Sequence, residues 1–242
     1  MPLRGRYPED TTFGNRIREL TPEKNKVAKE VIRRFLGQGS SAFIGDGSST
    51  FFVGLRMIEM KMQAMVWTNH VAIANEYSLQ KTDDIKLAHM DILIAGGQVD
   101  RDLMMTYNLD AEKNIVTWAG KAQCTILSVR SLFANRGPAG MEQKSLSIKQ
   151  EAVKSAMESG GNIIFIADHF KMSKGYTNEP LVFSSERDWK SAMESSNVHI
   201  VTSRRPDVTE ERLIKRPRSD TEWFQTNHWI LSRSMNERYV EV

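Results

Sequence analysis

The segment from residue 42 to residue 62 constrains the fold most, because a strand pattern changes into a helical pattern across one glycine turn. A short apolar run ends at Ile44 and is followed directly by Gly45-Asp46-Gly47. Apolar residues then recur at helical spacing, at Phe51, Leu55, Ile58 and Met62. The segment therefore predicts a buried strand, a tight turn and a helix in immediate succession.

The first turn of this helix carries three hydroxyl residues, Ser48, Ser49 and Thr50. The first backbone N–H groups of a helix have no partner within it, and the helix dipole makes that end positive. Because glycines allow close approach and hydroxyls add donors, the turn favours binding of a phosphate group. The alternative is an ordinary capped helix, for which one hydroxyl suffices. A nucleotide P-loop is excluded, because no lysine lies between Gly45 and Gly54.

The rest of the chain continues the alternation of strands and helices. Further apolar strands are predicted at residues 64–68, 90–95, 122–129, 162–167 and 198–202. Continuous apolar strands separated by helices indicate an α/β fold, with a mainly parallel sheet covered by helices on both faces. Residues 98–122 depart from this pattern. We expect a small antiparallel excursion there, with strands at 103–107 and 114–118.

Helix boundaries are predicted from capping residues. Thr21 is expected to cap a helix that has Pro22 at its first position. Asn69 and Ser147 are the expected caps of two later helices. The other predicted segments are an irregular arm at 1–21, a loop at 135–140, a helix from Ser184 or Ser185, and a short helix at 207–215.

Composition excludes several classes of protein. The chain has 242 residues, of which 40% are hydrophobic and 26% charged, as is typical of a globular protein. No apolar run approaches the roughly 20 residues that span a bilayer, and the N-terminus shows no secretory signal. The single cysteine, Cys124, excludes an internal disulfide and indicates a cytoplasmic protein. A net charge of +3 does not by itself predict nucleic-acid binding.

Polar residues follow four of the predicted strands. In open α/β sheets, ligands bind outside the carboxyl ends of the strands. Hydroxyls, amides and glycines gather at these ends, together with Asp168 and a nearby lysine. Such a set suits a small phosphorylated sugar or polyol, with the lysine as counter-charge to the phosphate. The predicted ligand-binding residues are Asp46, Gly47, Ser48, Ser49, Thr50, Thr68, Asn69, Gly96, Gly97 and Lys171.

The order of these motifs resembles the C-terminal effector-binding domain of DeoR-type repressors of sugar metabolism. The motifs are Asp46-Gly-Ser-Ser-Thr50, Thr68-Asn69, Gly96-Gly97, the helix 151–157, and Ile166-Ala-Asp168 followed by Lys171. The resemblance covers residues 24–203 and implies a fold like that of ribose-5-phosphate isomerase and the CoA-transferases. It also implies that the 46–50 loop holds a sugar phosphate and that the chain is a sensor rather than a catalyst. We expect this domain at 22–216, between the arm and a C-terminal tail at 217–242.

Two features depart from the DeoR pattern. A DeoR repressor begins with a winged helix-turn-helix, which needs about 45–50 residues for three helices and their turns. Only residues 1–21 precede the sensor-like region, so we expect no DNA-binding head and no direct sequence-specific DNA binding. The second departure is Arg130, a bulky charged residue where the family is small and glycine-rich. It is either a second phosphate partner or a surface residue.

Two other functions remain open. A sugar-phosphate isomerase needs a general base, for which Asp46, Asp168 and Glu151 are candidates, and Lys171 would stabilise an enediolate. The chain lacks the acidic Asp-Gly-x-Asp-Glu stretch of ribose-5-phosphate isomerases, which favours the sensor. The third function is an assembly subunit with an unused pocket. No cofactor is expected, and the five histidines are too scattered to predict a metal site.

The C-terminal tail predicts self-association. It lacks a clear strand or helix period, yet it contains Trp223, Phe224, Trp229, Ile230, Tyr239 and Val240. Exposed apolar residues in this number are a liability for a monomer, and aromatic residues are enriched in the cores of protein interfaces. We therefore expect a homo-oligomer. The alternative is a tail that folds back over its own domain.

Overall fold

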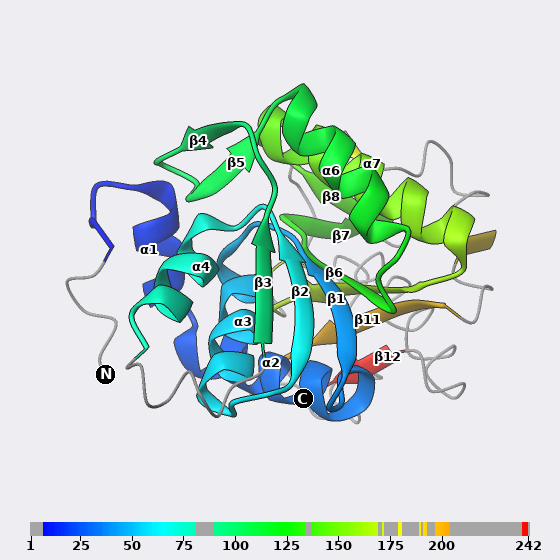
Figure 1. Cartoon of the computed structure of the whole chain (residues 1–242), viewed down its shortest axis with the longest axis horizontal. Coiled ribbons are helices and arrows are strands. Elements are labelled where there is room, and N and C mark those ends of the chain that lie inside the picture. Colours follow the sequence, from blue (N-terminus) through cyan, green and yellow to red (C-terminus); the bar gives the residue numbers. More distant parts are fainter. Residues whose placement is uncertain are drawn as a thin grey trace, which may run out of the picture.

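The chain folds around one parallel β-sheet with helices on both faces (Figure 1). The structure is a computed structural model that describes residues 7–80, 90–133, 137–168, 171, 179–180, 189, 191–192, 197–203 and 239–241. Seven strands form the sheet in the order β12-β11-β9-β6-β1-β2-β3, and every neighbouring pair is parallel. The strands are β1 (Ser40–Ile44), β2 (Ala64–Thr68), β3 (Met90–Ile94), β6 (Cys124–Ser128), β9 (Asn162–Ala167), β11 (Val198–Thr202) and β12 (Tyr239–Glu241). The predicted α/β class is confirmed.

The strand order reverses next to β1. β2 and β3 follow β1 on one side, whereas β6, β9, β11 and β12 lie on the other side. In the register of the sheet, Ile44 at the end of β1 pairs with Thr68 of β2 and with Ile126 of β6. The carboxyl ends of β1 and β6 therefore lie side by side at the point of reversal, which is the usual ligand position in open α/β sheets.

Helices cover the two faces of the sheet in two groups (Figure 1). The helices are α1 (Thr12–Arg18), α2 (Thr21–Phe35), α3 (Ser48–Glu59), α4 (Val71–Ser78), α6 (Leu109–Ala119) and α7 (Gln143–Ser159). Ala42 and Ile44 of β1 belong to the core that includes α1–α4, whereas Phe43 belongs to the core that includes α6 and α7. This alternation follows from the two-residue period of a strand, which sends neighbouring side chains to opposite faces.

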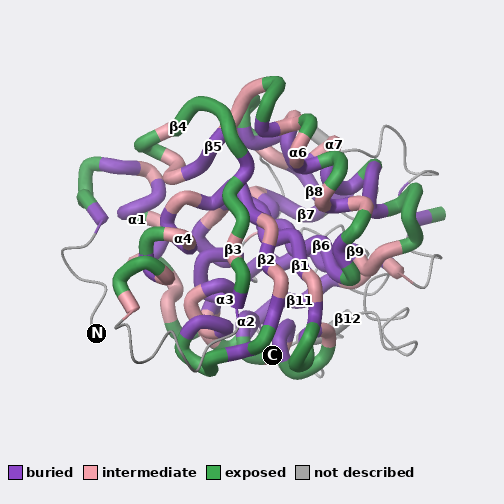
Figure 2. The backbone as a smooth tube through the Cα atoms, in the orientation of Figure 1, coloured by how far each residue is buried: buried purple, intermediate pink, exposed green. Residues whose placement is uncertain are grey.

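Burial follows the same layers (Figure 2). All five residues of the inner strand β6 are buried, as a parallel strand covered on both faces requires. The outer strand β3 is more open and exposes Leu93 and Ile94. The inner strands are therefore the enclosed part of the sheet, and β3 is its open edge.

Two small antiparallel sheets accompany the main sheet. β4 (Gln98–Asp100) pairs with β5 (Met105–Tyr107), and β8 lies between β7 and β10. These strands are β7 (Ser131–Phe133), β8 (Gly137–Gly140) and β10 (Glu179–Pro180). The predicted excursion is thus present, but the predicted strand at 114–118 was wrong, because those residues lie in α6. Asn108 starts that helix, since its side chain accepts hydrogen bonds from the N–H groups of Asp110 and Ala111.

The described part of the predicted N-terminal arm is folded. Thr11 caps α1 by accepting a hydrogen bond from the N–H of Gly14. Phe13 is buried in the core, and the hydroxyl of Tyr7 donates to Glu76 of α4 over 2.8 Å. The segment was predicted to be irregular because a helix of seven residues shows too little periodicity. Residues 137–140, predicted as part of a loop, form β8.

The three expected helix caps were wrong. The N-cap residues are Leu20 for α2, His70 for α4 and Glu142 for α7. Thr21 is the first residue of its helix, and Ser147 lies one turn inside α7. Asn69 points its side chain away from the helix and donates to Asp46. None of the three N-cap residues makes a side-chain capping hydrogen bond, and the Thr21 and Ser147 hydroxyls donate instead to backbone carbonyls of preceding residues.

Several predictions lie outside the described residues. They are the helix starts at Ser184 or Ser185, the short helix at 207–215, and most of the tail at 217–242. Tyr239–Glu241, the described part of the tail, forms β12 and pairs with β11. Within the described ranges, no helix is both long and apolar enough to cross a bilayer.

Candidate functional site

A cavity of about 70 Å³ lies at the end of the sheet where the strand order reverses. Its walls come from the turns after β1 and β6, the beginning of α7, the end of β9, and the α1–α2 corner. A cavity needs roughly 10–15 Å³ of such space to hold one water molecule. The space therefore suits a compact ligand.

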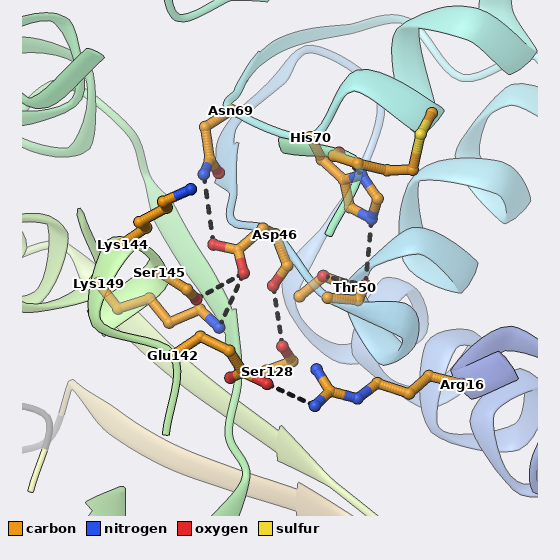
Figure 3. Close-up of polar contacts among 12 residues, drawn as sticks. Arg16, Asp46, Thr50, Asn69, His70, Ser128, Glu142, Lys144, Ser145 and Lys149 are labelled. Carbon is orange, nitrogen blue, oxygen red and sulfur yellow. Dashed lines mark hydrogen bonds and ion pairs between the residues drawn. The ribbon is translucent and has the colours of Figure 1, made fainter. Parts of the chain in front are cut away.

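Asp46, in the turn after β1, lies in the cavity wall and is held there by three neighbouring side chains (Figure 3). Its Oδ2 accepts from the Ser145 hydroxyl at 2.6 Å and lies 3.1 Å from Lys149 Nζ, while its Oδ1 accepts from Asn69 at 3.2 Å. Burial alone raises the pKa of this carboxyl, but Lys149 and the two hydrogen bonds outweigh burial, so the pKa lies below its usual value. Asp46 is therefore a fixed, ionised acceptor.

The turn itself requires glycine at position 47. Gly47 has a φ of +124°, and a Cβ there would lie 2.0 Å from the hydroxyl oxygen of Ser128. That hydroxyl donates to the backbone carbonyl of Asp46 at 2.8 Å and so ties the β1 turn to the end of β6. The Thr50 hydroxyl donates to the Gly47 carbonyl at 2.7 Å. These two hydrogen bonds fix the turn that places Ser48, the first residue of α3, in the cavity wall.

The side chain of His70 contacts the backbone of this turn (Figure 3). Its Nε2 lies 3.2 Å from the Gly47 carbonyl oxygen, and its Nδ1 lies 3.1 Å from that of Met104. Burial lowers the pKa of His70 to about 4, although Asp46 and the two carbonyls act in the opposite direction. The ring is therefore neutral at pH 7 and packs edge to face against Phe13. It belongs to the frame of the site, because it does not line the cavity.

Basic side chains converge on the cavity from several elements. They are Arg16, Lys24, Arg130, Lys149 and Lys171. Three of them form ion pairs with cavity carboxylates, namely Lys149 with Asp46, Lys171 with Asp168 at 3.5 Å, and Arg16 with Glu142 at 2.5 Å. Burial lowers the pKa of Lys171, and the neighbouring charges of Lys149 and Arg16 lower it further against the opposing effect of Asp168. Positive and negative side chains therefore face one another in the cavity wall.

The structure divides the ten predicted ligand residues into two groups. Those that line the cavity are Asp46, Gly47, Ser48 and Lys171. Those that do not are Ser49, Thr50, Thr68, Asn69, Gly96 and Gly97. Thr68 and Asn69 support the site from the end of β2, because the Thr68 hydroxyl donates to the carbonyl of Ile44 at 2.6 Å. Gly96 and Gly97 are exposed after β3 and are not brought to the cavity.

The cavity wall also contains residues that were not among the ten predicted ligand residues. Arg130 and Asp168, both considered earlier, line the cavity, whereas Glu151 does not. The missed residues are Arg16, Lys24, Ser128, Glu142, Ser145 and Lys149. A helical pattern in α7 could have shown that residues 142, 145 and 149 share one face, but not which face meets the β1 turn. In the described ranges, no group of three or more His, Cys, Asp or Glu side chains could hold a metal ion.

The family comparison covers most of this architecture. The model of the DeoR C terminal sensor domain matches residues 19–183, which is more than half of the chain. The chain belongs to the DeoR C-terminal sensor domain family. The match includes the turn after β1, the start of α7 and Lys171, and it confirms the resemblance predicted from the motifs. No curated protein sequence matches the chain.

Some solved structures are similar to part of the chain at low sequence identity. Translation initiation factor eIF-2B from Pyrococcus horikoshii OT3 is 10% identical with a TM-score of 0.43, covering 64% of this chain and 49% of its own. Ribose 5-phosphate isomerase from Plasmodium falciparum is 14% identical with a TM-score of 0.37, covering 61% and 51%. eIF2B delta from Chaetomium thermophilum is 12% identical with a TM-score of 0.42, covering 70% and 57%. The DeoR-type chain thus spans about half the length of these structures.

Proposed function

We propose that this DeoR-type domain is a sensor that binds a phosphorylated sugar or polyol in the cavity after β1 and thereby regulates carbohydrate metabolism. The observation that supports this proposal is the joint presence of the α3 N-terminal turn, the fixed Asp46 carboxylate and buried lysines around one compact space. The N–H groups at the start of α3 suit phosphate oxygens, because they have no partners within the helix. Asp46 suits sugar hydroxyls, because an ionised carboxylate only accepts hydrogen bonds.

The proposal is tested by calorimetric titration with a panel of triose, tetrose, pentose and hexose phosphates. Ser48→Glu places a negative charge at the start of α3 and should abolish binding, whereas Ser78→Glu on the exposed end of α4 should not. Asp46→Asn keeps the shape of the side chain and should weaken binding of the sugar while leaving binding of inorganic phosphate largely intact. If folded wild-type protein binds none of the panel, the sensor proposal fails.

An isomerase is the second candidate, because the Asp168 carboxylate and the Lys171 ammonium lie together at the cavity. Such a pair could move a proton next to a sugar carbonyl and stabilise the resulting enediolate. Asp46 is less suited to this role, since its carboxylate is already held by three neighbours. Proton NMR of the bound sugar phosphates in D₂O separates the two functions. A sensor leaves the C2 proton in place, and an isomerase exchanges it.

The remaining proposals concern the surroundings of the domain. We propose a cytoplasmic homo-oligomer that binds duplex DNA only weakly and with steep salt dependence, because the net charge is +3. Deleting residues 219–242 should lower the assembly state measured by light scattering. A monomeric full-length chain at micromolar concentration would contradict the oligomer, and a salt-tolerant, sequence-specific complex would contradict the DNA proposal.

A further inference from the structure

The α1–α2 corner brings two positive charges to the cavity, Arg16 from α1 and Lys24 from α2. Lys24 is only 3% exposed, which is unusual for a lysine. Its ammonium group donates to the backbone carbonyls of Arg16 and Glu19, the latter at 2.6 Å. Lys24 therefore closes the corner between the two helices and also lines the cavity.

The charge of Lys24 is not neutralised by an ion pair. Among the described carboxylates, none lies within 4.0 Å of its ammonium group. An ammonium group has three donors, and the two backbone carbonyls occupy two of them. The third donor is left for the cavity. A buried charge without a counter-ion is costly, so this corner favours an anion.

Other positive charges increase this preference. Burial and the nearby charge of Lys171 lower the pKa of Lys24 to about 8, although Asp168 and Glu19 act in the opposite direction. Arg16 also lowers the pKa of Lys24 and of Lys171. The positive charges of Arg16, Lys24 and Lys171 therefore repel one another across the cavity. Because they lie on α1, α2 and the segment after β9, an anion that contacts all three would join these elements.

Resting on the proposed function, we propose that the phosphate group of the ligand is held between the first turn of α3 and a basic corner formed by Arg16, Lys24 and Lys171. The N-terminal segment is then part of the binding site. The phosphate competes with Glu142 for Arg16 and with Asp168 for Lys171, since these two basic residues form ion pairs with those carboxylates. Occupancy of the cavity is thereby coupled to the docking of α1 on the domain.

A purely structural role for Lys24 is the rival explanation. Its two carbonyl partners lie at the end of α1, where a lysine commonly caps a helix. In that role, replacing Lys24 would lower the thermal stability of the protein and leave anion binding unchanged. The two explanations therefore differ in binding, not in stability.

The test uses inorganic phosphate as the probe, titrated by calorimetry into the full chain. Lys24→Met should weaken phosphate binding by about tenfold or more, because a charge-assisted hydrogen bond is lost. Lys26→Met, on the same helix but exposed, is the matched control and should bind as wild type. Lys24→Arg keeps the charge and should retain binding. Melting temperatures of all variants establish that each is folded.

Hydrogen exchange gives a second readout that remains valid if Lys24→Met is unstable. In wild-type protein, phosphate should slow amide exchange at residues 12–18, because the anion holds α1 in place. Unchanged exchange in that helix, or wild-type affinity in folded Lys24→Met, overturns the proposal. If Asp46→Asn weakens sugar-phosphate binding while Lys24→Met does not, the sensor function stands and the basic corner alone is wrong. If the wild type binds neither phosphate nor sugar phosphate, both proposals fall.

Discussion

The ammonium nitrogen of Lys149 lies 3.1 Å from Oδ2 of Asp46. Lys149 belongs to α7, which covers one face of the sheet, whereas Asp46 lies in the turn that leads to α3 on the other face. Their side chains are 10% and 6% exposed. This buried ion pair therefore links the two helical layers at the cavity, and the binding site and the fold depend on the same contact.

Lys149→Met should destabilise the protein by about 3–5 kcal/mol, because it leaves the buried Asp46 carboxylate without its counter-charge. Urea unfolding measures the change. Lys154→Met, on an exposed position of the same helix, is the control and should lie within about 0.5 kcal/mol of wild type. Adding Asp46→Asn to Lys149→Met should recover part of the lost stability, since the uncompensated charge is removed. Strictly additive losses would show that the pair is not coupled.

Gly47→Ala should destabilise the domain and abolish ligand binding together. The new Cβ would lie 2.0 Å from the Ser128 hydroxyl oxygen, and the φ of +124° is strained for any residue with a side chain. Gly37→Ala is the matched control, because a Cβ at position 37 meets nothing within 4 Å. Ser128→Ala should relieve only part of the defect, since the Ser128 Cβ itself lies 3.0 Å away. A Gly47→Ala variant with wild-type affinity would contradict the assigned role of the turn.

The sequence allowed prediction of the parts of the fold whose signals are local. The apolar strands are examples, because continuous runs such as residues 162–167 are buried on both faces and resemble little else. The stretch at 114–118 was assigned wrongly because its β-branched and aromatic residues favour a strand, while the Asn108 cap and burial of Ile115 against α7 favour a helix. In this case tertiary packing overrode local preference.

The site was predictable only where one segment contains it. The turn at 46–48 carries its own glycines and hydroxyls, so its position at the cavity follows from the strand–turn–helix pattern. Lys149 and Arg16 reach the cavity from distant segments, and their roles depend on how α7 and α1 pack on the sheet. Gly96 and Gly97 were predicted at the site because they follow a strand at the same edge of the sheet, but that position does not bring them to the cavity.

Stability should rise with pH between about pH 4 and pH 6.5 because of His70. Burial lowers its folded pKa to about 4 from the ordinary histidine value of 6.5, so in this window the unfolded chain binds a proton that the folded protein does not. The expected gain is on the order of 3 kcal/mol for a shift of this size. Asp46, whose pKa is also lowered in the folded protein, contributes at lower pH because its ordinary pKa is about 3.9.

Urea unfolding at several pH values checks this expectation. His70→Gln should flatten the rise, because an amide does not titrate. His199→Gln is the comparison variant, since His199 lies on β11 away from the cavity. If His70→Gln keeps the full slope between pH 4 and pH 6.5, another group is responsible for it.

Affinity for a sugar phosphate should fall as the pH rises through about 8. An anion binds best when Lys24 is protonated, and burial together with the charge of Lys171 lowers the pKa of Lys24 to about 8. Bound phosphate stabilises the ammonium form, so binding above that pH must take up a proton from solution. Phosphate esters already carry nearly their full charge above pH 7, because their second pKa is about 6, and the fall therefore reports on the protein.

Calorimetry in two buffers with different ionisation enthalpies measures the proton uptake directly. Lys24→Arg, which stays protonated, should remove both the uptake and the fall in affinity, whereas an unchanged pH profile in that variant would move the titrating group away from Lys24.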